Sequence, residues 1–284
     1  MPSYSTLIAD AGSTKVEWAI VKDKISGEAR FTTTGINALI SSDDDIRATL
    51  HEVTEKIGEN VIINRIFYYG AGCATPAICK KLTSSIQQIW PDATVYVASD
   101  LEGAAKSLLG KSDGIACILG TGSNSALFDG KKIVMNIPPL GFILGDEGSG
   151  TALGKRLIKE IYKSDIPSDL KTLFFSETDL SLSEILDKVY RSPAPNKFIA
   201  SLVPFIRKHI EHPFFNNMVI EEFREFFRRN VSLYPDAKEK PVSFTGSVAF
   251  YFEPQLREAA HAEGFFTDKI TNTPMDGLIS YHLS

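Results

Sequence analysis

Two stretches of the chain repeat one order of short extended runs and tight turns. The first comprises predicted strands at residues 5–9, 16–21 and 29–33. The second comprises predicted strands at residues 114–119, 125–128 and 132–135. In both, turns rich in glycine and polar residues separate the strands. The repeat predicts an internal duplication, which is visible in the pattern more than in residue identity.

Helices and further strands are predicted for the remaining sequence. Apolar residues at a helical period follow the N-cap residue Ser42, and Pro76 opens a second helix that runs to residue 90. Strands at residues 65–69 and 94–98 and a helix at 100–109 complete a β-α-β pattern. Beyond Gly150 the chain is mainly helical, with caps at Ser149 and Ser183. Later elements are predicted at residues 214–229, 242–245, 247–262 and 274–283.

These elements predict an α/β protein with two lobes. At 284 residues the chain is long enough for two domains of ordinary size. We expect a first lobe over residues 1–112 and a second lobe over residues 113–273. The helix at 274–284 is expected to pack back on the first lobe.

Composition narrows the classes of function. Thirty Lys and Arg against 35 Asp and Glu give a net charge of −5, which disfavours general binding of nucleic acid through a basic surface. We find no secretory signal and no run of about 18 apolar residues, so we expect no membrane partner. Three widely placed cysteines fit reduced thiols and a cytoplasmic location. The phenylalanines of residues 214–229 indicate a buried helix face, and His209 and His212 a solvated face rather than a metal site.

Three glycine-containing turns follow predicted strands and suit an anionic ligand. They are Asp10–Lys15, Gly120–Asn124 and Thr245–Ser247. Small residues let backbone N–H groups approach a phosphate, although each turn alone is more often a plain hairpin turn. Neither a complete Walker A pattern nor GxGxxG is present. Two such turns at equivalent places of the repeat predict a polyphosphate held from both sides, with Asp10 holding Mg²⁺ through water and Lys15 offsetting phosphate charge.

Two carboxylates are candidates for chemistry on an acceptor molecule. Asp100 ends a strand and opens a helix, so it is interpreted as an N-cap, as a base for an attacking hydroxyl, or as both. Asp146 lies in residues 141–150, where four glycines surround the pair Asp146 and Glu147. Adjacent carboxylates do not set the separation that glycoside hydrolysis needs. We therefore expect Asp146 to accept hydrogen bonds from a polyol.

With these residues in place, the chain resembles the superfamily of acetate and sugar kinases, heat-shock cognate chaperones and actin. Within it, the chain is similar over nearly its whole length to the N-acetylglucosamine kinase group of the BadF/BadG/BcrA/BcrD ATPase family. The matching segments are Asp10–Lys15, Ser99–Ala104, Gly120–Asn124, Gly145–Ser149 and Thr245–Ser247. The resemblance implies two ribonuclease H-like lobes with ATP and Mg²⁺ in the cleft between them.

The resemblance also implies roles for single residues. ATP contacts are implied for Gly12, Ser13, Thr14, Lys15, Thr121, Gly122, Gly246 and Ser247. Sugar contacts are implied for Asn37, Ser123, Asn124, Gly141 and Asp146, and Asp100 is implied as the catalytic base. A tryptophan of the family's sugar loop is replaced here around Pro139–Leu140, which leaves the exact sugar open.

We therefore expect an ATP-dependent kinase of a small-molecule amino sugar, with N-acetylglucosamine and its 6-phosphate as first choice and a homodimer left open. One alternative is an ATPase that activates a partner reductase or dehydratase, with Cys73 and Cys79 as iron–sulfur ligands. The turn Gly120–Asn124 lacks the aspartate that such activators carry. A second alternative is a sugar or nucleotide sensor without turnover, against which the presence of both Asp10 and Asp100 argues.

Overall fold

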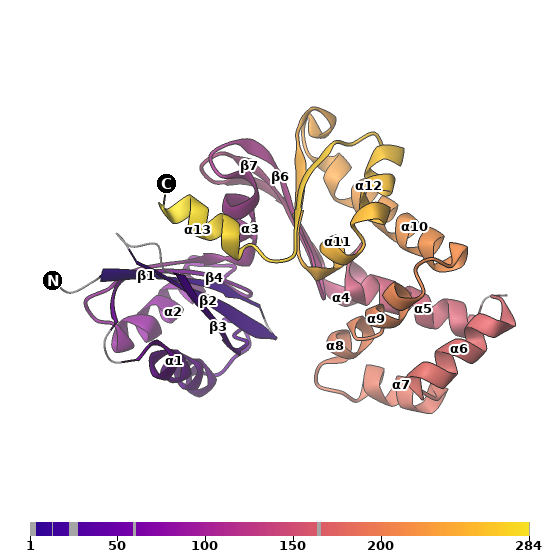
Figure 1. The fold of residues 1–284 in the computed structure, drawn as a ribbon, viewed down its shortest axis with the longest axis horizontal. Helices are drawn as coiled ribbons and strands as arrows, with labels where there is room; N and C mark the ends of the chain where they lie inside the picture. Colours follow the sequence, from indigo (N-terminus) through magenta and orange to yellow (C-terminus); the bar gives the residue numbers. More distant parts are fainter. Residues whose placement is uncertain (1–3, 13, 23–27, 59–60, 164–165, 284) are drawn as a thin grey trace. The chain divides into compact units, whose positions relative to one another are not determined.

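The computed structural model describes residues 4–12, 14–22, 28–58, 61–163 and 166–283. The chain divides into two compact units, coloured along the sequence in Figure 1. The first unit comprises Met1–Ser112, Gly130–Lys132 and Thr273–Ser284, and the second comprises Asp113–Asp129 and Ile133–Asn272.

The first unit is built on a five-stranded mixed sheet of order β3-β2-β1-β4-β5. The strands are β1 (Tyr4–Ala11), β2 (Lys15–Lys22), β3 (Glu28–Thr34), β4 (Ile62–Gly70) and β5 (Thr94–Ser99). β1, β2 and β3 pair antiparallel, whereas β1, β4 and β5 pair parallel. The carboxyl ends of β1, β4 and β5 therefore lie at one edge of the sheet.

Helices cover both faces of this sheet, as Figure 1 shows. They are α1 (Asp43–Ile57), α2 (Pro76–Ile89), α3 (Asp100–Leu109) and α13 (Met275–Leu283). Alternate residues of β1 serve the two faces: Leu7 joins the core under α1 and α2, and Ile8 joins the core under α13. Gly277 of α13 lies so close to Ser107 of α3 that a Cβ would collide with it, so a glycine lets these two helices pack tightly.

The second unit repeats the topology of the first. Its sheet has the order β10-β9-β6-β7-β8, which read from the other end matches the first sheet strand for strand. The strands are β6 (Asp113–Leu119), β7 (Ser123–Asp129), β8 (Ile133–Ile137), β9 (Val242–Thr245) and β10 (Thr267–Thr271). Again the first three pair antiparallel, and β6, β9 and β10 pair parallel. The α/β class and the internal duplication are confirmed.

Most of the second unit is helical, between β8 and β9 and between β9 and β10. Its helices are α4 (Gly141–Leu144), α5 (Gly150–Lys163), α6 (Ser168–Thr178), α7 (Leu182–Tyr190), α8 (Pro195–Ala200), α9 (Val203–Lys208), α10 (Pro213–Arg229), η1 (Val231–Leu233), η2 (Ala237–Glu239), α11 (Ser247–Tyr251) and α12 (Glu253–Ala262). The phenylalanine face of α10 is buried, as predicted: Phe215, Phe223, Phe226 and Phe227 are all solvent-inaccessible.

Some predicted details were wrong. α7 begins after Ser181, whose side chain forms a capping box with Glu184, and not at Ser183. β10 was not predicted at all.

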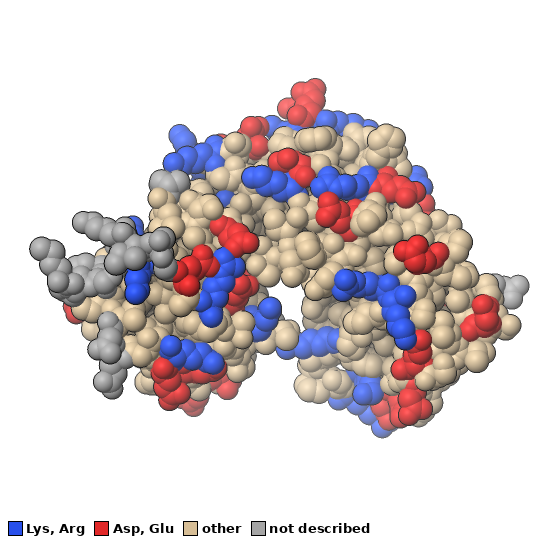
Figure 2. All heavy atoms as spheres, viewed as in Figure 1, with Lys and Arg blue, Asp and Glu red and all other residues tan. Residues whose placement is uncertain are grey.

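On the face drawn in Figure 2, Lys and Arg lie among Asp and Glu without a large field of one sign.

Candidate active site

In the first unit, two carboxylates lie at the carboxyl edge of the parallel strands. Asp10 is near the end of β1, and Asp100 follows β5 as the first residue of α3. Strand β4 lies between them and ends at Gly70, which pairs with Ala11 on one side and Ser99 on the other. Because Gly70 has no side chain, nothing from the middle strand's last residue projects over this edge.

Both carboxyl groups have raised pKa values, and the charge of Asp100 contributes to that of Asp10. Burial, with the nearby carboxylates of Asp100 and Glu17, raises the pKa of Asp10 to about 7, and Lys15 opposes the rise. Burial also raises the pKa of Asp100, against the backbone amides of Leu101 and of Asp100 itself. Such a pair of oxygen ligands gains from a hard cation between or beside them.

Helix α3 is capped by Ser99, and the interpretation of Asp100 as the N-cap is wrong. The Ser99 hydroxyl accepts a hydrogen bond from the Glu102 amide at 3.2 Å. The Asp100 carboxylate accepts from the Leu101 amide at 2.8 Å, at the positive end of the helix. The carboxylate is therefore oriented at the sheet edge without being used to cap the helix.

The first glycine turn joins β1 to β2. The Gly12 amide donates to the Lys15 carbonyl at 3.0 Å, and Thr14 and Lys15 are exposed. Ser13 lies outside the described residues. The turn thus presents small groups and one cation beside Asp10, as an anion site requires.

Asn37 is held against the turn that follows β4. Its side-chain oxygen accepts from the Leu39 amide at 3.1 Å. The Ala38 amide donates to Ala71, and the Ala71 amide donates in turn to Ala11. Gly72, at φ +81°, lies against the Asn37 oxygen with no room for a Cβ. The loop of Asn37 is therefore fixed next to the end of β1.

In the second unit, the glycine turn Gly120–Gly122 is anchored by the start of α5. The Gly150 amide donates to the Gly120 carbonyl at 2.8 Å, and the Thr151 amide donates to the Thr121 carbonyl at 3.1 Å. The Thr151 hydroxyl also donates to Thr121, at 2.9 Å. Because helix α5 binds the carbonyl side of the turn, the turn is held rigidly.

Gly246 lies beside this turn at the end of β9. It adopts φ +113°, and a Cβ there would collide with the Leu119 carbonyl at the end of β6. The position therefore requires glycine for both its backbone angle and its space. Ser247, the first residue of α11, is exposed next to it.

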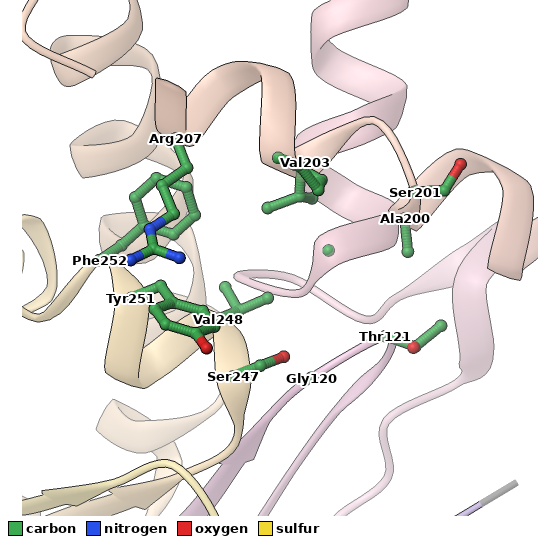
Figure 3. A pocket seen from close by; sticks show the side chains of 12 residues that line it. Gly120, Thr121, Ala200, Ser201, Val203, Arg207, Ser247, Val248, Tyr251 and Phe252 are labelled. Carbon is green, nitrogen blue, oxygen red and sulfur yellow. The ribbon is translucent and has the colours of Figure 1, made fainter. Parts of the chain in front are cut away.

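A pocket of about 240 Å³ extends from these two turns, wholly within the second unit (Figure 3). Its walls come from the turns and from α8, α9 and α11. They are Gly120, Thr121, Gly150, Ala200, Ser201, Val203, Pro204, Arg207, Ser247, Val248, Tyr251 and Phe252. The guanidinium carbon of Arg207 lies 3.7 Å from the centre of the Tyr251 ring, at the end of the pocket away from Thr121. The pocket thus joins a phosphate-type turn to an aromatic and apolar wall.

Asp146 lies next to the same turn, on the loop between α4 and α5. The residue is buried at 8% exposure, and the Ser123 amide donates to the Asp146 Oδ1 at 3.4 Å. Gly122 faces the carboxylate so closely that a Cβ would be 3.0 Å from Oδ2. Burial raises the pKa of Asp146, against the Ser123 amide and Lys155. The structure therefore brings Ser123, Gly122 and Asp146 together.

The other two predicted sugar residues of this unit are Asn124 and Gly141, whose contacts differ from those of Asp146. The Asn124 side-chain oxygen, on β7, accepts from Asn136 of β8 at 2.9 Å. Gly141 opens α4 at φ +73° and is exposed. Asn37 and Asp100 belong to the first unit, and Asp146 belongs to the second.

Sequence reasoning missed the pocket wall on α8, α9 and α11. Arg207 and Tyr251 are separated by a long stretch of sequence, and no local pattern marks either residue. It also missed Glu222 and Asn230 of the α10 region, which bond to the loop of Asp146. Their signal was their spacing on one helix face, which is recognisable only once the loop's position is known.

Among the described residues no group of three His, Cys, Asp or Glu is placed to hold a metal ion. The three cysteines are free. In the described part of the chain, no helix has the length and apolar character needed to cross a membrane.

No family model matches the chain, and no curated protein matches it in sequence. Solved structures do match. One from Porphyromonas gingivalis, described as a candidate N-acetylglucosamine kinase, is 42% identical, with 98% of each chain covered and a TM-score of 0.92. One from Chromobacterium violaceum, described in the same way, is 14% identical over 100% of both chains, with a TM-score of 0.75. The ethanolamine utilization protein EutJ of Carboxydothermus hydrogenoformans is 14% identical, covers 100% of this chain and 90% of its own, and has a TM-score of 0.53. The fold is that of the actin-like ATPases.

Proposed function

Because the chain belongs to the family of sugar kinases that includes the Porphyromonas gingivalis candidate N-acetylglucosamine kinase, we propose that it phosphorylates an amino sugar with ATP. N-acetylglucosamine is the first choice of sugar, and its 6-hydroxyl is the first choice of acceptor. The observation that carries the proposal is the 42% identity over 98% of both chains. Asp10, Asp100 and the pocket of the second unit also have the chemistry that a kinase needs.

The residues present fit ATP and Mg²⁺. The pocket in Figure 3 offers apolar and aromatic walls for a nucleoside, and it ends at the Gly120–Gly122 turn, whose small residues suit phosphates. Thr121, Gly122, Gly246 and Ser247 would contact the nucleotide there, with Gly12, Ser13, Thr14 and Lys15 contributing from the first unit. Asp10, with the carboxylates of Asp100 and Glu17 near it, would hold Mg²⁺ largely through water. ATP would supply the phosphoryl group, and the cation would offset the charge on the phosphates.

Asp100 is proposed as the general base. Its carboxylate would take the proton of the attacking sugar hydroxyl as the oxygen forms its bond to phosphorus. Burial and its raised pKa suit that task, because a more basic carboxylate accepts a proton more readily. The Leu101 amide holds the carboxylate in place through the transfer.

Polar groups of both units are proposed to bind the sugar. Asp146 would accept hydrogen bonds from adjacent hydroxyls, as a buried carboxylate already bonded by one amide can do. Ser123, Asn124 and Gly141 would line the same site, and Asn37 would contribute from the first unit.

The proposal is tested by coupled ADP release with a panel of acceptors. The panel is N-acetylglucosamine, glucosamine, N-acetylmannosamine, N-acetylmuramic acid and glucose. We expect N-acetylglucosamine to raise ADP release furthest above the rate without acceptor. If no sugar raises it, the kinase proposal fails. Iron analysis of the purified protein tests the activator alternative, which requires a bound cluster.

A cytoplasmic location is part of the same proposal, and a homodimer is left open. Cell fractionation and size-exclusion chromatography with light scattering test them, and neither result bears on the kinase activity.

A further inference from the structure

The loop that carries Asp146 has an unfavourable backbone conformation. Leu140 and Asp146 adopt φ of 58° and 60°, a left-handed conformation that is costly for residues other than glycine. Gly141 and Gly148, at φ 73° and 71°, continue the same irregular path. Such a conformation persists only where the surrounding structure holds it.

Helix α10 supplies that hold through three residues on one face. The Glu222 Oε1 accepts a hydrogen bond from the Gly148 amide at 3.3 Å. One turn further along, Phe226 packs so closely on Gly148 that a Cβ there would lie 2.9 Å from the Phe226 Cβ. The buried Asn230, at the end of the helix, donates from its side-chain amide to the Glu147 carboxylate at 3.3 Å. The spacing of four residues places all three in one row.

Glu222 also links the loop to the helix that follows it. Its side chain is only 13% exposed, and its Oε2 lies 3.8 Å from the Arg156 guanidinium of α5. The loop therefore contacts a buried carboxylate that is fixed from two helices. Asp146 lies two residues before Gly148, so the position of its carboxylate depends on this arrangement.

We propose that Glu222 is a positioning residue of the sugar site: it holds the 145–150 loop so that Asp146 points at the sugar. This inference rests on the proposed function for the identity of the ligand. The structural half, in which Glu222 holds the loop, does not depend on any activity. Glu222 itself is not proposed to touch the sugar or the nucleotide.

The test compares three variants of the full chain. Glu222→Ala removes the acceptor of the Gly148 amide. Glu222→Gln keeps a carbonyl acceptor and removes the charge. Glu225→Ala is the matched control, since Glu225 is on the same helix and bonds only to Arg228 and Arg229 among the described residues. Two measurements are made: hydrogen exchange of peptides covering residues 141–153, and steady-state kinetics with each substrate varied.

For Glu222→Ala we expect loop exchange and the KM for sugar to rise about 10-fold, because a buried amide loses its partner. The KM for ATP and kcat are expected to stay within about twofold of the parent. Glu222→Gln should restore both readouts, and Glu225→Ala should change neither. Unchanged loop exchange in Glu222→Ala overturns the positioning role. Faster exchange with an unchanged sugar KM, or with an equal rise in the KM for ATP, overturns the link to the sugar site. If the parent phosphorylates no sugar, the proposed function fails, and the exchange data alone decide whether Glu222 holds the loop.

Discussion

Asp10 and Asp100 lie at one sheet edge, yet their surroundings differ in kind. Asp10 is on a strand with Glu17 opposite it and Lys15 near it, so its charge is set by neighbouring charges as well as by burial. Asp100 is at the start of a helix, where hydrogen bonds from backbone amides oppose the rise in pKa that burial causes. A carboxylate with other carboxylates near it, like Asp10, suits a cation. A carboxylate that an amide holds in one orientation, like Asp100, suits proton transfer. This difference supports the proposal that Asp100 is the base and that Asp10 lies beside the cation.

Replacing Asp100 by Asn tests that assignment. The amide keeps the shape but cannot accept the hydroxyl proton, so kcat should fall by about 10²–10⁴-fold. The KM for ATP should change little, because the proposed nucleoside pocket lies in the other unit. Steady-state kinetics with the preferred sugar measure both, with the exposed Asp92→Asn as control. Full sugar-dependent activity in Asp100→Asn would exclude it as the base.

Replacing Gly246 by Ala tests the close approach of β9 to β6. The new Cβ would collide with the Leu119 carbonyl, and alanine would have to adopt φ +113°. We expect Gly246→Ala to lower the free energy of unfolding and to raise the KM for ATP. Gly110→Ala is the control for backbone strain alone, since Gly110 has φ +61° with open space around it. Strain alone costs about 1–3 kcal/mol, so Gly246→Ala should lose more free energy of unfolding than Gly110→Ala in denaturant titration. Equal losses in the two variants would show that the contact with Leu119 is unimportant.

Among the helices and strands, the sequence predicted those whose ends are set by residues close in the chain. The N-cap at Ser42 and the start at Thr75–Pro76 predicted two helices, and both begin where predicted. β10 was missed because Thr267–Thr271 reads Thr-Asp-Lys-Ile-Thr, with one apolar residue and exposed polar ones at a sheet edge. Its strand conformation comes from pairing with β9.

The residues of the candidate site likewise fall into those that the sequence reveals and those that only the fold brings together. The glycine turns and Asp100 were recognisable because their residue types are unusual next to a strand. The aromatic wall was not, since Arg207 and Tyr251 meet only when α9 and α11 pack. The bond from Glu222 to the Gly148 amide likewise joins residues 74 positions apart, a contact that no local pattern encodes.

The closing helix α13 carries a pH-dependent contribution to stability. His282 stacks on Phe67 with ring centres 3.7 Å apart, and its Nε2 is 2.9 Å from the Tyr69 hydroxyl. Burial, with Lys106 and Arg65, lowers the pKa of His282 from 6.5 to about 4. The folded protein therefore binds this proton less well than the unfolded chain. The contribution is complete above about pH 6.5 and is lost as the pH falls towards 4.

His282→Phe keeps a ring on Phe67 and removes the titrating group. We expect the unfolding midpoint of the parent to fall between pH 6.5 and pH 4 by more than that of His282→Phe. Thermal unfolding at pH 7.5, 6.5, 5.5 and 4.5 measures the difference. His51→Gln, at an exposed position of α1, should follow the parent. Parallel curves for the parent and His282→Phe would contradict the prediction.

At the scale of the whole molecule, the overall charge does not favour an anionic substrate. The chain carries a net charge of −5, so under the proposed function ATP would have to be held by local groups. The proposed groups belong to different units: Lys15 and Asp10 to the first, and the pocket with its turns to the second. Nucleoside binding and proton transfer are therefore expected to be separable by mutation.

The final prediction uses that separation. A non-hydrolysable ATP analogue with Mg²⁺ at 100 times its Kd should stabilise the parent by about 2.7 kcal/mol. Asp100→Asn should be stabilised equally, because every residue lining the pocket lies in the second unit. Arg207→Ala should bind the analogue about 2–30-fold more weakly, since the Tyr251 ring loses its cation. Lys208→Ala removes the next cation on α9, which pairs with Glu177 instead, and should bind like the parent. Calorimetric titration decides: equal affinities for the Arg207 and Lys208 variants, or loss of binding in Asp100→Asn, would place the nucleoside elsewhere.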